Sequence, residues 1–87
     1  MHLNGVTLRK IRIAYGLTQA DMGALLDCTA GMVNKIERGK YPMTDNIRKA
    51  INRELNLTPE KVEALLAEYD RIMKRKEGAK MRKGTAV

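Results

Sequence analysis

Residues 16–40 read GLTQADMGALLDCTAGMVNKIERGK, and this stretch decides the fold because it contains two short helical patterns around a tight break. Thr18 and Thr29 are each placed to cap a helix, since a threonine hydroxyl accepts a hydrogen bond from a free backbone N–H of the first turn. Asp21 stands three residues after Thr18, which is a weak form of the capping box. The break begins at Asp27, so only two or three residues separate the two predicted helices.

Apolar residues at helical spacing predict the faces through which these two helices pack together. Gly23 removes side-chain bulk where the second of the two helices must pass close to the first. The residues predicted to fill the space between them are Met22, Leu26, Cys28, Val33 and Ile36.

Helical patterns also flank this stretch on both sides. Before it, a helix is expected from about Asn4 or Thr7 to Tyr15. After it, Thr44 or Asp45 caps a further helix whose apolar residues recur every fourth position. Few stretches alternate as strands do, so the fold class predicted from the sequence is all-α, with five helices.

The last helix has the clearest start in the chain. Thr58 stands at the cap and the proline after it occupies the first helical position, where a missing N–H does no harm. We expect this extended helix to end at about Glu77, with Gly78 as its stop. Residues 1–78 then form one helical domain, and residues 79–87 form a basic flexible tail.

The charge of the chain is uneven along its length. The formal net charge is +7 over 87 residues, and residues 71–87 contain seven basic residues against one acidic residue. Residues 1–70 are nearly balanced. A basic segment of this size suits a polyanionic partner, although it can also serve only to keep the chain soluble.

Several classes of protein do not fit the composition. One cysteine, Cys28, cannot form an intramolecular disulfide, and with a single distant histidine, His2, it does not make a zinc site. We therefore expect no metal or cofactor and a cytoplasmic location. No apolar run approaches the roughly 18 residues of a membrane span. No nucleophile–base–acid set and no phosphate-binding glycine loop is present, so an enzyme is not predicted.

Two short helices joined by a tight turn are typical of a unit that reads duplex DNA. The second helix can enter the major groove, which is about 12 Å wide, when the first helix braces it across the phosphate backbone. Double-stranded DNA is therefore the expected partner.

The same stretch resembles a known family. GLTQADMGALL at residues 16–26 is similar to the pattern G-L-[ST]-Q-x-x-L-A-x-x-L, and IERGK at residues 36–40 is similar to its I-E-x-G-K ending. These are motifs of the Cro/CI-type (Xre-type) helix-turn-helix family of phage repressors and bacterial regulators. The resemblance covers about residues 7–58 and implies the five-helix lambda-repressor-like fold and a transcriptional regulator, with a repressor favoured.

The resemblance also implies roles for individual residues. Gln19 matches a position that grips phosphate and supports the reading helix, and Arg38 and Lys40 match positions that touch the backbone. Arg12 and Glu37 match a pair that ties the first helix to the end of the third. The residues expected to contact DNA are Thr18, Gln19, Thr29, Ala30, Gly31, Asn34, Lys35, Arg38 and Lys40.

Departures from the family pattern concern the turn and the base-reading positions. Asp27 stands where the family usually has glycine. Ala30 and Gly31 occupy main base-reading positions and cannot form side-chain hydrogen bonds. Asn34 and Lys35 remain as polar candidates for base contacts, so we expect modest base readout supplemented by DNA shape.

The end of the last helix indicates an interaction surface. Tyr69, Ile72 and Met73 continue its apolar stripe beyond the length that a small core needs. We expect them to be exposed and to form a homodimer seam that addresses a near-palindromic operator, although packing on the protein's own core is the alternative. A regulatory protein partner is a further possibility. The weak base readout leaves open a second function, a protein-interaction adaptor or antitoxin.

Overall fold

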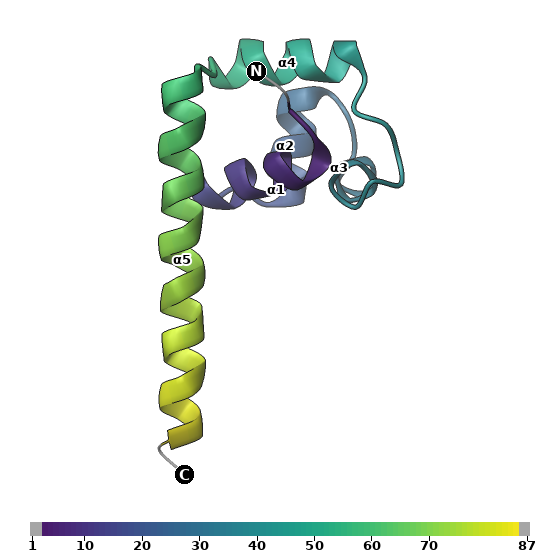
Figure 1. Cartoon of the computed structure of the whole chain (residues 1–87). Helices are drawn as coiled ribbons and strands as arrows, with labels where there is room; N and C mark the ends of the chain where they lie inside the picture. The colour runs from purple at the N-terminus through teal and green to yellow at the C-terminus, as the bar shows by residue number, and fades with distance from the viewer. Residues whose placement is uncertain (1–2, 86–87) are drawn as a thin grey trace.

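The computed structural model describes residues 3–85, which form five helices and, within that range, no strand (Figure 1). The all-α fold class predicted from the sequence is therefore confirmed. The helices are α1 (Gly5–Ala14), α2 (Gln19–Leu26), α3 (Ala30–Glu37), α4 (Asp45–Leu55) and α5 (Pro59–Thr85).

Side-chain caps set the helix starts. The Asn4 carboxamide oxygen accepts a hydrogen bond from the N–H of Thr7 at 2.9 Å and begins α1. Thr44, rather than Asp45, caps α4, because its hydroxyl oxygen accepts from the backbone N–H of the third helical residue at 3.2 Å. Thr58 caps α5 in the same way at 3.1 Å. These local bonds satisfy N–H groups that have no partner within the helix.

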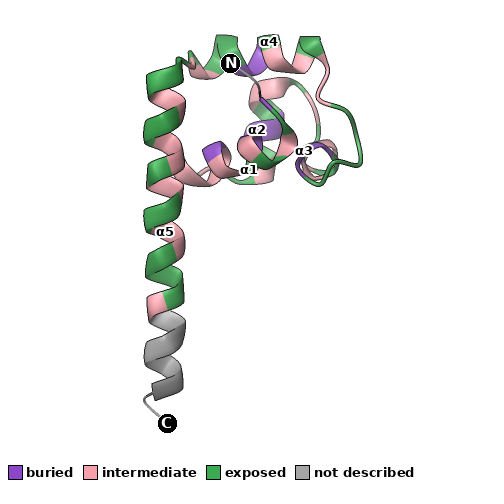
Figure 2. Ribbon diagram, viewed as in Figure 1, coloured by how far each residue is buried: buried purple, intermediate pink, exposed green. Residues whose placement is uncertain are grey.

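The core lies between α1, α2, α3 and α4, and Figure 2 shows its buried segments in purple. Leu3, which precedes the first cap, is only 4 % exposed and was not predicted as a core residue. Helix α5 contributes partly buried Val62 and Leu65 to the same cluster. The fully buried large side chains are Leu8, Ile11, Met22, Val33, Ile36 and Ile51.

Helix α5 packs against α1 and then continues well past the rest of the molecule (Figure 1). Its predicted end at about Glu77 is wrong, because the helix runs through Gly78 to Thr85. A glycine costs a helix about 1 kcal/mol relative to alanine, and the residues that follow are mostly strong helix formers. Residues 79–85 of the expected basic tail therefore have helical backbone, and the flexibility of the tail stays a prediction. Residues 86–87 lie outside the described part of the chain.

Candidate nucleic-acid interface

The turn between α2 and α3 depends on a left-handed residue and a close backbone approach. Asp27 has φ 57° and ψ 45°, a conformation that aspartate adopts more easily than most residues. The N–H of Cys28 donates to the carbonyl oxygen of Gly23 at 2.8 Å. A Cβ added to Gly23 would lie 2.6 Å from the Cys28 carbonyl oxygen. The same Cβ would lie 3.0 Å from the carbonyl carbon of Thr29, the cap of α3, so Gly23 makes room both for the turn and for the start of α3, as the sequence had indicated.

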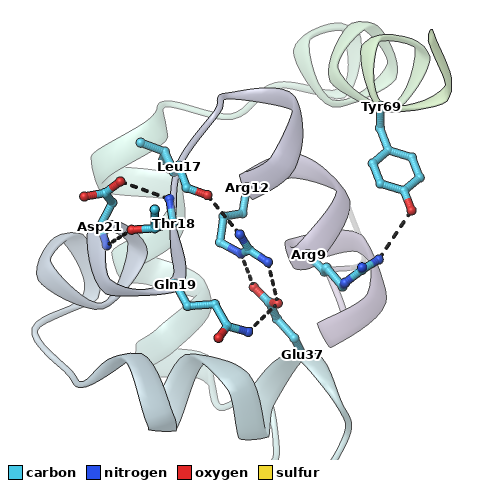
Figure 3. A network of polar contacts seen from close by, with 8 residues as sticks. All are labelled: Arg9, Arg12, Leu17, Thr18, Gln19, Asp21, Glu37 and Tyr69. Carbon is cyan, nitrogen blue, oxygen red and sulfur yellow. Dashed lines mark hydrogen bonds and ion pairs between the residues drawn. The ribbon is translucent and has the colours of Figure 1, made fainter. Parts of the chain in front are cut away.

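The caps of α2 and α3 use their threonine hydroxyls as acceptors. The Thr18 Oγ1 accepts from the N–H of Asp21 at 3.0 Å, and the Asp21 carboxylate accepts from the N–H of Thr18 at 2.9 Å (Figure 3). The backbone N–H and the hydroxyl of Thr18 together lower the pKa of Asp21 below its usual value. Thr29 accepts from the N–H of Met32 at 3.1 Å. Both threonines are exposed, and the Thr29 hydroxyl keeps its own hydrogen for donation to an outside acceptor.

A buried carboxylate connects α1, α2 and α3 (Figure 3). Glu37 accepts from Arg12 Nε at 2.7 Å and from Arg12 Nη2 at 3.1 Å. It also accepts from Gln19 Nε2 at 3.2 Å. Arg12 Nη1 donates to the Leu17 carbonyl oxygen at 2.9 Å, just before α2. The network holds the end of α3 at a fixed place against the other two helices, as expected for a buried, bidentate arginine–carboxylate pair.

A backbone contact adds to this attachment. A Cβ built on Gly5 would lie 2.1 Å from the carbonyl oxygen of Ile36. The first turn of α1 is therefore in direct contact with the last turn of α3, and only glycine fits there. The sequence reasoning did not identify Gly5, although a glycine directly after the cap residue Asn4 was a visible signal.

The base-reading candidates lie on α3. Gly31 and Lys35 are exposed, and Ala30 and Asn34 are half-buried. The nearest atom to a Cβ added at Gly31 is the Thr29 hydroxyl oxygen, at 3.8 Å. This part of α3 is therefore open and presents little side-chain bulk.

The loop after α3 adds positive charge to that of Lys35 on the helix. Gly39 takes a left-handed conformation with φ 74°, which lets the chain fold back on the helix end. The N–H groups of Lys40 and Tyr41 then donate to the Lys35 carbonyl oxygen at 2.8 and 3.2 Å. Arg38 and Lys40 are exposed. Tyr41, which was not predicted, is 39 % exposed next to them and adds a hydroxyl to this surface.

Cys28 lies in the turn and packs against the core as a half-buried residue. Burial, and then the nearby Asp27 carboxylate, raises the pKa of its thiol. A raised pKa keeps the thiol protonated and therefore weakly reactive. This agrees with a packing role for Cys28.

The three residues expected at a dimer seam are half-buried instead of exposed. The Tyr69 hydroxyl oxygen accepts from Arg9 Nη1 at 3.4 Å, and Lys10 Nζ lies 5.5 Å from the centre of its ring. Tyr69 therefore contacts α1 through Arg9 and Lys10, but it is not among the residues packed against the core cluster, so the dimer seam stays a prediction. Val62 and Leu65 of α5 pack against the core cluster, whereas Ile72 and Met73 are not among the residues that do.

Among residues 3–85, no group of three or more histidine, cysteine, aspartate or glutamate side chains is placed to hold a metal ion. In the same part of the chain, no helix is long and apolar enough to cross a membrane.

Two braced helices, an open face on the second of them and a cationic loop after it define a small helical DNA-binding domain. A family model described as Helix-turn-helix matches residues 8–62, and the chain belongs to this Cro/CI-type helix-turn-helix family of DNA-binding regulators. The match covers α2 and α3 and reaches into α5. No curated protein and no solved structure matches the chain.

Proposed function

We propose that the protein is a sequence-specific transcriptional regulator, a repressor that acts as a homodimer on a near-palindromic operator. The observation that supports this most directly is the position of three exposed cations, Lys35, Arg38 and Lys40, on α3 and the loop after it. They adjoin the helix end that Glu37 anchors. A charged surface on a firmly held helix is suited to duplex DNA.

Base readout and backbone contact fall to different residues in this proposal. Asn34 and Lys35 contact base edges, where asparagine suits adenine and lysine suits the acceptors of guanine. Ala30 contacts a thymine methyl group, and Gly31 lets the helix backbone approach the bases closely. Phosphates are bound by Thr18, Gln19, Thr29, Arg38 and Lys40.

The hydrogen bond from Gln19 to Glu37 supports a role for Gln19 in joining the start of α2 to the end of α3. The amide nitrogen of Gln19 donates one hydrogen to Glu37, and this nitrogen carries a second hydrogen. A phosphate at the start of α2 would meet the second amide hydrogen of Gln19 and the Thr18 hydroxyl. Both groups also lie at the positive end of the helix dipole.

The experiment that tests this function is selection of binding sites from a pool of random duplex DNA at about 150 mM salt, where non-specific binding is weak. We expect one near-palindromic motif, with half-sites about one helical turn, or about 34 Å, apart. Retention of DNA without an enriched motif would contradict a sequence-specific regulator.

Variants separate the two kinds of contact on the selected site. Lys35→Ala should reduce discrimination at one base pair by about 1–3 kcal/mol. Lys40→Ala should weaken binding to all sequences and lower the slope of log K against log salt by about 0.9. Lys49→Ala, at an exposed position on α4, is the matched control and should leave both quantities unchanged.

A second candidate is a protein-interaction adaptor or antitoxin with the same fold. The exposed Gly31 and the small Ala30 favour it, because neither side chain can read a base by hydrogen bonding. Affinity for DNA that depends on salt but not on sequence would support this candidate over the first.

A further inference from the structure

Charge divides α5 into two unlike halves. Residues 59–70 contain four acidic residues and one basic residue, and residues 71–85 contain seven basic residues and one acidic residue. Among the described side chains, Glu60, Glu63 and Asp70 are exposed in the first half. In the second half Arg71, Lys74, Arg75 and Lys76 are exposed. The helix is therefore a rod with a negative end and a positive end.

The border between the two halves lies at the middle of the helix. Pro59–Thr85 is 27 residues long, which gives about 40 Å at 1.5 Å per residue, and residue 72 is its midpoint. Ile72 and Met73 form an apolar pair at this midpoint. Tyr69, about one turn earlier, contacts Arg9 and Lys10 of α1. Figure 1 shows the C-terminal part of α5 extending away from the body of the molecule.

We propose that two copies of this chain pair through α5 in antiparallel orientation, crossing at Ile72 and Met73. In this arrangement the acidic half of each helix lies beside the basic half of its partner. Parallel pairing would place like charges together along the whole length. Apolar contact at the crossing supplies the attraction, and the charges select the orientation.

The first half of α5 has room for a partner. Helix α1 covers the side that carries Val62, Leu65 and Tyr69. Glu60, Glu63 and Asp70 are exposed, so they lie on the sides of the helix that α1 leaves open. The second half extends past the body and can reach along a neighbouring α5 without moving its own domain (Figure 1).

Such pairing depends on salt. Exposed charge pairs are individually weak, and several of them act together along the helix. The Debye length falls from about 10 Å at 0.1 M salt to about 3 Å at 1 M, so the dimer dissociation constant should rise with ionic strength.

The test is sedimentation equilibrium of the full chain without DNA, with circular dichroism to check the fold. Lys74→Glu with Arg75→Glu should raise the dimer dissociation constant about tenfold, because these changes place acidic against acidic residues. Adding Glu68→Lys and Asp70→Lys to the same chain should restore it to within about threefold, because in an antiparallel pair crossing at residue 72 these two positions lie opposite residues 74–76 of the partner. Lys49→Glu with Arg53→Glu makes the same charge change on α4 and should have little effect.

Each outcome decides the proposal. Loss and restoration support antiparallel pairing, because the restored chain still sets like charges together in a parallel pair. Weakening that the second pair of changes does not restore overturns it. The proposal is also overturned if the wild-type chain is a monomer and its Lys74→Glu, Arg75→Glu variant loses affinity for random duplex DNA. That result would show that the basic half of α5 binds phosphates instead. The inference rests on the proposed function for the use of a dimer, but site selection on DNA tests that function separately.

Discussion

Replacing Arg12 by methionine should destabilise the protein strongly, because it leaves a buried carboxylate without its partner. The Glu37 side chain is 2 % exposed and that of Arg12 is 12 % exposed, so water cannot replace the lost hydrogen bonds without opening the structure. Removing one member of a buried pair typically costs about 3–5 kcal/mol. The Leu17 carbonyl oxygen loses its hydrogen bond from Arg12 as well.

A loss of this size is a large part of the total stability of a small domain, which is about 5–15 kcal/mol. Urea denaturation followed by circular dichroism measures it as the change in the free energy of unfolding. In a thermal scan, each 1 kcal/mol corresponds to about 4–8 °C in a domain of 60–100 residues. We therefore expect Arg12→Met to lower Tm by at least about 12 °C.

The double variant Arg12→Met, Glu37→Met is the decisive control. It removes both charges, so it should be much more stable than Arg12→Met alone, although Gln19 loses one acceptor. A cost below about 1 kcal/mol for Arg12→Met would refute the reasoning, since exposed ion pairs have values in that range. A double variant no more stable than Arg12→Met would refute it as well, because the unpaired carboxylate could not then be the cause.

Three further predictions follow from the geometry. Gly23→Ala should lower the free energy of unfolding by about 1–3 kcal/mol in urea, because of the contact with the Cys28 carbonyl oxygen, whereas Gly31→Ala at an open helix position should raise it by up to about 1 kcal/mol. Leu3→Ala should cost about 2–5 kcal/mol in the same assay, and a smaller loss than that of an exposed-site control would contradict its place in the core. The pKa of Asp21 is lowered in the folded state, so its contribution to stability is complete above the unfolded-state value and disappears as pH falls below about 4. Urea titrations of the wild type and Asp21→Asn should therefore converge at acid pH, and a constant difference would contradict this.

Much of the fold could be predicted because helix starts are determined locally. Thr18, Thr29 and Thr58 each accept a hydrogen bond from a backbone N–H three residues later, and a side chain so close in sequence is easily recognised. The end of α5 was harder to predict. Gly78 opposes the helix by about 1 kcal/mol, but its neighbours favour it, and the sum over the window decides the outcome.

Contacts between residues far apart in sequence explain the remaining differences. Leu3 has no helical periodicity of its own, and it is buried because the chain before α1 lies against the core, where its carbonyl oxygen accepts from Arg48 at 3.3 Å. Tyr69 was placed at a free surface because its partners Arg9 and Lys10 lie about 60 positions earlier. The residue pattern within one segment does not indicate a contact with a segment far away in the sequence.

The open face of α3 separates what the protein recognises from what keeps it folded. At Gly31, which is exposed, an added Cβ would meet only the Thr29 hydroxyl oxygen, at 3.8 Å. The anchoring atoms of this helix lie at its other end, on Glu37. If position 31 reads a base, as proposed above, new residues there would change the preferred base without a redesign of the interior. On the proposed function, a library of variants at this position would acquire new operators while the architecture stays constant.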